Sequence, residues 1–143
     1  MERALLRDVF DGRRGLPREA FVDDAWFAEE VDALVVRQWM CIAIEDDVAE
    51  PGDVHPVAMA GIPLLVTRGH DHVIRVLHNV CSHRGAKLVE EPACGVGALT
   101  CPYHQWNYTL SGDLQGVPFR RGVKQDGKVN GGMPADFNPA EHG

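Results

Sequence analysis

Two cysteines and two histidines alternate along the chain in an order that suits metal binding. They form the pairs Cys81-x-His83 and Cys101-x-x-His104, with 17 residues between the pairs. Zinc accepts two thiolates and two imidazoles, but its common sites group Cys with Cys and His with His. The alternating order suits a [2Fe–2S] cluster in which the cysteines bind one iron and the histidines the other. The spacing therefore favours an iron–sulfur cluster and leaves a zinc-bound structural module as an alternative.

This mixed ligand set defines the Rieske type of centre, and it predicts one-electron chemistry. Ferric ions, sulfides and thiolates of such a cluster sum to zero charge when the imidazoles are neutral. A neutral cluster accepts an electron more readily than a negatively charged one. Rieske potentials accordingly lie at roughly −150 to +300 mV, against about −400 mV for plant-type ferredoxins. We therefore expect an electron-transfer function.

The other two cysteines, Cys41 and Cys94, have no histidine beside them. Pairing four cysteines in disulfides would require an oxidising compartment, and the charged N-terminus lacks the apolar core of a secretion signal. We therefore expect a cytoplasmic protein with reduced thiols. Within it, Cys41 is predicted to be a buried apolar thiol, and Cys94 a loop thiol without a partner.

An arm and a helix are predicted ahead of the ligand pairs. Residues 1–22 are charged and interrupted by Gly and Pro, which is typical of an arm. Asp23 is a favourable N-cap for a helix from Asp24 to Gln38. Apolar residues at helical spacing give this helix one apolar face, so residues 23–40 are expected to pack on the domain. These apolar residues are Trp26, Phe27, Val31, Leu34 and Val35.

Short strands punctuated by Gly and Pro are predicted downstream. They are expected at residues 39–44, 54–60, 64–68, 73–80, 98–100 and 106–110. The run Gly69-His70-Asp71-His72 predicts a hairpin turn. The pattern indicates a mostly β fold, an antiparallel β-sandwich or small barrel with one N-terminal helix, in which residues 41–118 form the cluster domain. Two loops at its tip would then close on one cluster from opposite sides.

Length, composition and charge limit the number of domains and the classes of partner. A length of 143 residues suits one domain, and a net charge of −7 disfavours nucleic acid and anionic membranes as partners. No apolar run approaches the ~20 residues of a membrane span. Residues 119–143 form a Gly/Pro-rich tail without a long legible element. We expect this tail to lead into a remainder that is missing from the chain.

The two ligand segments also carry a family resemblance. Cys81-Ser82-His83-Arg84-Gly85 and Cys101-Pro102-Tyr103-His104-Gln105-Trp106 resemble the Rieske domain of ring-hydroxylating oxygenase large (alpha) subunits. The resemblance covers nearly the whole chain from about Pro17. Within that family, the run Gly112–Pro134 is most similar to large subunits of the salicylate 5-hydroxylase kind. The resemblance implies a Rieske-type antiparallel β-sandwich, and it implies the same cluster ligands as the spacing: Cys81, His83, Cys101 and His104.

Four neighbours of the ligands are candidates for tuning the cluster or docking an electron donor. They are Arg84, Tyr103, Trp106 and Tyr108. Arg84 would attract an acidic donor or orient the histidine loop, with a surface ion pair as the alternative. The two tyrosines would donate hydrogen bonds and Trp106 would exclude water, with ordinary packing as the alternative for all three.

The resembled enzymes hydroxylate at a mononuclear Fe(II) held by two histidines and a carboxylate. That site belongs to a C-terminal catalytic domain introduced by Asp-x-x-His-x-x-x-x-His. His78 and His83 have the histidine spacing, but residue 75 is Arg. We therefore expect a chain from which the catalytic domain is absent. It would be part of an oxidoreductase, an aromatic ring-hydroxylating mono- or dioxygenase, without oxygenase activity of its own.

The resemblance also implies partners. A ferredoxin or reductase would supply electrons, and a small beta subunit and neighbouring alpha subunits would complete a hetero-oligomer. Aromatic carboxylates such as salicylate would be the substrates of the full-length enzyme. A freestanding Rieske ferredoxin is the alternative, and the sequence that follows Gly143 would separate the two.

Overall fold

The structure is a computed structural model that describes residues 15–143. Contacts divide the chain into a unit that ends at Met40 and a second unit, Cys41–Gly143. Most of the arm predicted over residues 1–22 lies outside the described residues. The predicted packing of residues 23–40 on the domain stays a prediction.

The predicted helix is present but shorter as a regular α-helix. After the short helix α2 (Glu19–Val22), helix α3 covers Asp24–Glu30, and the Asp23 carboxylate caps it by accepting from the Trp26 N–H at 2.9 Å. The chain then widens into a π-helix, Val31–Val35, instead of continuing as α-helix to residue 38. Valines favour few side-chain conformations in an α-helix, which weakens that conformation here.

Two predictions for the segment after the helix are wrong. Residues 39–44 form no strand, because no neighbouring strand pairs with them, and a 3-10 helix follows at Glu45–Val48. Trp39 is fully exposed, so its apolar character does not mark a core position. Cys41 is likewise exposed rather than buried. An apolar run alone did not distinguish a connecting segment from a strand.

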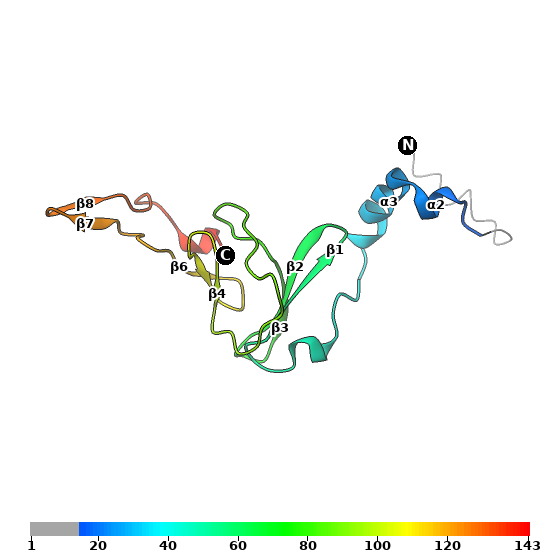
Figure 1. Ribbon diagram of the computed structural model, residues 1–143, viewed down its shortest axis with the longest axis horizontal. Coiled ribbons are helices and arrows are strands. Elements are labelled where there is room, and N and C mark those ends of the chain that lie inside the picture. The colour runs from blue at the N-terminus through cyan, green and yellow to red at the C-terminus, as the bar shows by residue number, and fades with distance from the viewer. Residues whose placement is uncertain (1–14) are drawn as a thin grey trace. The chain divides into compact units, whose positions relative to one another are not determined.

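The first sheet of the second unit matches the predicted hairpins. Its strands are β1 (Val54–Met59), β2 (Ile62–Arg68) and β3 (Ile74–His78), antiparallel in that order (Figure 1). The turn between β2 and β3 places His72 at a φ of 63°. The Asp71 carboxylate braces this turn by accepting from the Val73 N–H and the Arg75 guanidinium.

The predicted ligands Cys101 and His104 lie in a loop between two strands of a second antiparallel sheet. It consists of β4 (Leu99–Thr100), β5 (Asn107–Tyr108) and β6 (Leu114–Gly116). The tail adds the hairpin β7 (Val123–Gln125) with β8 (Lys128–Asn130), and a 3-10 helix at Pro139–Glu141 that contacts β6 (Figure 1). The prediction of a mostly β, antiparallel fold is confirmed.

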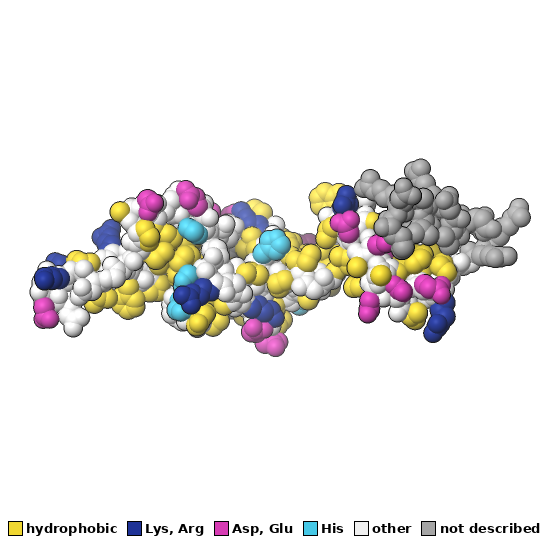
Figure 2. Space-filling view, turned by 90° about the horizontal axis from the view of Figure 1, so that it is seen from above, with side chains coloured by type: hydrophobic (Ala, Val, Ile, Leu, Met, Phe, Trp, Pro, Cys, Tyr) yellow, Lys and Arg dark blue, Asp and Glu magenta, His cyan; other side chains and the backbone are white. Residues whose placement is uncertain are grey.

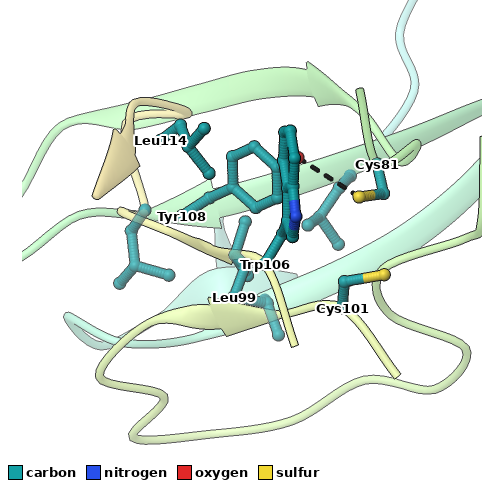
Figure 3. Close-up of a cluster of buried hydrophobic side chains, with 9 residues drawn as sticks. Cys81, Leu99, Cys101, Trp106, Tyr108 and Leu114 are labelled. Atoms are coloured by element: carbon teal, nitrogen blue, oxygen red, sulfur yellow. Dashed lines mark hydrogen bonds between the residues drawn. The ribbon is translucent and has the colours of Figure 1, made fainter. Parts of the chain in front are cut away.

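One buried cluster joins the two sheets. It contains residues of both and the two cysteines of the predicted site: Val54, Leu65, Cys81, Leu99, Cys101, Trp106, Tyr108, Leu110 and Leu114. Figure 3 shows both cysteines at one end of this cluster and Leu114 at the other, with Trp106 and Tyr108 between them. The buried Thr67 hydroxyl of β2 donates to the Leu110 carbonyl at 2.8 Å and ties the sheets together. The two predicted cysteine ligands therefore lie at one end of this buried core.

Cys94 is an exposed free thiol in a loop. The neighbouring Asp53 carboxylate, by hydrogen bonding and by its negative charge, raises the pKa of Cys94. Cys94 therefore stays a protonated thiol at neutral pH.

The surface shows charges of both signs. In Figure 2, dark-blue Lys and Arg side chains are scattered among magenta Asp and Glu side chains on the face in view. Within the part of the chain that the structure describes, no helix has the length and apolar character needed to cross a bilayer.

Candidate metal centre

The two ligand loops share one backbone pattern. They begin at Cys81 and Cys101, and in each the cysteine N–H donates to the carbonyl five residues on, at 2.7 and 2.8 Å. The cysteine carbonyl accepts from the N–H four residues on, at 2.9 and 3.0 Å. The residue in that fourth position is left-handed in both loops, Gly85 at a φ of 70° and Gln105 at 60°. Each cysteine therefore opens a tight turn that its own backbone closes, with a histidine inside.

The turns bring the two sulfurs together in a buried place. Cys81 and Cys101 are both 1% exposed. Burial raises the pKa of the Cys101 thiol, but the backbone N–H groups of His104 and Tyr103 and the Cys81 thiol bond to its sulfur and bring the pKa below its ordinary value. This environment favours the thiolate, which is the form that binds a metal.

The two imidazoles form a second pair beside the sulfurs. The rings of His83 and His104 have centroids 4.8 Å apart and planes inclined by 66°. Removal from water, together with the nearby His104 and Arg84, lowers the pKa of His83. A lowered pKa keeps this imidazole neutral, as a metal ligand must be.

One ring nitrogen of this imidazole pair is buried without a hydrogen-bond partner. Nδ1 of His104 is buried and has no hydrogen-bond partner. Buried polar atoms almost always have one, so an orphaned imidazole nitrogen indicates a place where another group binds. Because a neutral imidazole nitrogen is a good iron ligand, this nitrogen fits a metal centre.

Aromatic residues surround the imidazoles. Trp106 is 5% exposed, and its indole stacks on the His83 ring at 4.7 Å with 6° between the planes. Tyr103 leans on the His104 ring at 3.8 Å, although its side chain is 57% exposed. The structure therefore places Trp106 against one predicted ligand and Tyr103 against the other.

Tyr108 approaches the sulfur side. Its hydroxyl lies 3.2 Å from the Cys81 sulfur, and it also contacts the N–H of Ser82 at 3.2 Å and the Ser82 hydroxyl at 2.9 Å (Figure 3 shows the sulfur contact). Burial and the Cys81 sulfur raise the pKa of Tyr108 to about 12. The phenol therefore keeps its proton at neutral pH and is able to donate it in a hydrogen bond to a thiolate.

Arg84 lies on the exposed side of the first loop. Its positive charge is one of the causes that lower the pKa of His83. The four ion pairs among the described residues involve other arginines and lysines, so the alternative of a surface ion pair at Arg84 finds no support there.

Sequence reasoning missed three supports of the site. Asn79 is fully buried; its side-chain oxygen accepts from the N–H groups of Leu88 and Val89, and its amide donates to the Val89 carbonyl, which holds the segment after the first loop. Phe137 and His142, in the tail, contact Trp106. A lone Asn two residues before a ligand was the only signal for the first, and nothing local linked the tail to the site.

The side chains at the site fall into two pairs of different chemistry, two buried thiols and two imidazoles. A sulfur pair beside an imidazole pair, with an orphaned imidazole nitrogen, matches a cluster with two thiolates on one iron and two imidazoles on the other.

Comparisons with known proteins agree with this chemistry. The family model for the Rieske [2Fe-2S] domain matches residues 38–126. The chain is 43% identical over 134 residues to the salicylate 5-hydroxylase large oxygenase component of Ralstonia sp, which covers 93% of this chain and 32% of that protein. It is 37% identical to the anthranilate 1,2-dioxygenase large subunit of Burkholderia cepacia, covering 93% of this chain and 30% of that protein. The chain therefore spans about a third of the length of these two large subunits.

Solved structures share the fold. A quaternary ammonium Rieske monooxygenase, CntA, in complex with an inhibitor, superposes with a TM-score of 0.75 at 26% identity, covering 90% of this chain and 33% of that one. Naphthalene 1,2-dioxygenase with indole bound gives a TM-score of 0.71 at 29% identity, covering 85% and 25%. Both superpositions take in most of this chain and a third or less of the larger protein.

The family match decides between the two metals that the spacing allowed. It covers more than half of the chain and describes a [2Fe-2S] domain, not a zinc module. Rieske clusters pass electrons one at a time. The protein belongs to the Rieske [2Fe-2S] domain family, and its role is electron transfer.

Proposed function

We propose that the chain is the electron-transfer domain of a ring-hydroxylating oxygenase large subunit. Its similarity to the large components of a salicylate hydroxylase and an anthranilate dioxygenase supports this proposal. The full-length enzyme would hydroxylate an aromatic carboxylate at a mononuclear iron outside the described residues. The sequence downstream of Gly143 tests the proposal: an Asp-x-x-His-x-x-x-x-His motif supports it, and a stop codon favours a freestanding Rieske ferredoxin.

The ligands that we propose are Cys81 and Cys101 for one iron and His83 and His104 for the other. The observation that carries this assignment is the matched pair of turns, which gathers two buried sulfurs and sets the imidazoles 4.8 Å apart. The bound cluster would supply one-electron chemistry. Around it, the core excludes water from the sulfurs, Trp106 supports the His83 ring, and Tyr108 donates to the Cys81 sulfur.

The test is spectroscopic. The purified chain should absorb visible light and give a paramagnetic resonance signal when reduced. Cys81→Ser and Cys101→Ser should lose both, while the matched variants Cys41→Ser and Cys94→Ser, at exposed cysteines, should keep both. A colourless wild-type protein that binds zinc would overturn the assignment.

One histidine variant examines the division of ligands between the two irons. His83→Cys adds a thiolate and hence negative charge, so a cluster that forms should have a lowered potential. An unchanged potential would argue against His83 as a ligand. His78→Cys, on the exposed end of β3, is the matched control and should leave the potential unchanged.

Partners and location follow from the same proposal. The structure of a related quaternary ammonium Rieske monooxygenase gives insight into inter-subunit electron transfer in that enzyme. We propose that this domain takes electrons from a ferredoxin or reductase in the cytoplasm and passes them to a neighbouring alpha subunit, in an assembly with a small beta subunit. If Arg84 guides an acidic donor, Arg84→Glu should slow reduction by that donor, whereas Arg121→Glu, also exposed, should not.

A further inference from the structure

Two tail residues, Phe137 and His142, contact the indole of Trp106, which stacks on His83. The rings of Phe137 and His142 meet the Trp106 indole edge-on, with centroids 5.8 and 5.9 Å away and planes inclined by 74° and 84°. They also stack on each other at 4.9 Å with 14° between their planes. The indole therefore stacks on the His83 imidazole and also makes T-shaped contacts with an aromatic pair from the tail.

The local fold of the tail makes this pair. The one-turn helix Pro139–Glu141 lies between Phe137 and His142 and turns the chain so that both rings reach the same indole. Asn138 caps this turn by accepting from the Ala140 N–H at 3.2 Å. Phe137 is anchored in turn by Arg120, whose guanidinium lies 5.5 Å from the ring centroid and donates to the Phe137 carbonyl at 3.3 Å.

A hydrogen bond ties the same segment to the first ligand loop. The Ser82 hydroxyl donates to the His142 carbonyl at 2.6 Å, across 60 residues of sequence. Ser82 lies between Cys81 and His83 in the chain. The tail thus contacts the site twice, once through the Trp106 indole and once through the Ser82 side chain beside the proposed ligands.

From these contacts we infer that Phe137 and His142 are positioning residues for His83. The inference rests on the proposed ligand role of His83. Offset and edge-to-face contacts between aromatic rings have preferred geometries, so the tail pair limits the tilt of the indole and the indole limits the rotation of the imidazole. A metal ligand whose orientation is held by its surroundings gives a metal centre with uniform properties.

The test compares paramagnetic resonance spectra and reduction potentials of the reduced full chain. Phe137→Ala and His142→Ala should broaden the resonance lines and shift the potential, because the His83 ring then takes up a range of orientations. His142→Phe keeps a flat ring in the stack and should restore the wild-type spectrum. Phe119→Ala is the matched control, since Phe119 is an aromatic residue of the same tail that is 73% exposed.

Each outcome has a separate meaning. A wild-type chain without a Rieske signal would overturn the proposed ligands. A normal wild-type signal that Phe137→Ala and His142→Ala leave unchanged, with only a lower melting temperature, would reduce the tail pair to a packing role and overturn this inference. Failure of His142→Phe to restore the spectrum of His142→Ala would also contradict it.

Discussion

The imidazole of His83 lies flat against the indole of Trp106, with 4.7 Å between the ring centroids. The Trp106 carbonyl also accepts the N–H of Cys101 and so closes the second ligand turn. One residue of the second loop therefore supports the proposed ligand His83 of the first loop. The two halves of the site are coupled through Trp106.

Replacing Trp106 tests how much this coupling stabilises the fold. Trp106→Ala removes a buried aromatic side chain from the core and should lower the free energy of unfolding by about 3–5 kcal/mol. Denaturant unfolding followed by circular dichroism would measure the change. Trp106→Phe keeps a ring against His83 and should cost clearly less. A loss below about 1 kcal/mol for the alanine variant would contradict the buried role of this residue.

The phenol of Tyr108 offers a direct test of hydrogen bonding to the sulfur. Tyr108→Phe removes the hydroxyl that lies 3.2 Å from Cys81 and keeps the ring in the core. A donated hydrogen bond stabilises the more negative, reduced cluster, so its loss should lower the reduction potential. Redox titration would show the shift. Tyr103→Phe, at an exposed tyrosine, is the control, and equal shifts in both variants would contradict the assignment to Tyr108.

The left-handed residues that close the two turns should respond in opposite ways. Gly85→Ala meets no atom within 4 Å but places a Cβ at a φ of 70°, which should cost about 1 kcal/mol. Gln105→Gly relieves a side chain held at 60°, partly offset by a more flexible unfolded chain, and should stabilise by about 0.5 kcal/mol. Thermal unfolding of both variants measures the changes. Destabilisation of equal size in both variants would show that side-chain contacts, not backbone strain, determine the changes in stability.

The hairpin turn before β3 should show a defined dependence on pH. The Arg75 guanidinium and the Val73 N–H lower the pKa of Asp71 from 3.8 to about 2. Because this pKa is depressed on folding, the stabilising contribution is full above the unfolded value and is lost as the pH falls through about 2. The difference in melting temperature between wild type and Asp71→Asn should be equal at pH 7 and pH 5 and shrink below pH 4. A difference that already shrinks between pH 7 and pH 5 would refute this assignment.

The sequence by itself predicted the chemistry of the candidate site and the positions of most of the strands. Alternating Cys and His at a defined spacing narrowed the metal to two choices, and Gly and Pro between short apolar runs marked β1, β2 and β3 within two residues. These signals are local, because ligand type, turn residues and strand alternation are properties of neighbouring residues. The same local reasoning failed at residues 39–44 and at Cys41. Whether an apolar segment forms a strand or is buried depends there on strand pairing and packing in the folded chain.

Only the tertiary structure decided which residues support the site. Asn79, Ser82 and the tail pair Phe137 and His142 reach it across spans of up to 60 residues, and such contacts leave no periodic pattern in the chain. The packing also determined that Tyr108 meets Cys81 and that Trp106 meets His83. The physical reason is that a cluster site needs its ligands held in one geometry, and that geometry is set by the core and by the chain segments that fold back onto it.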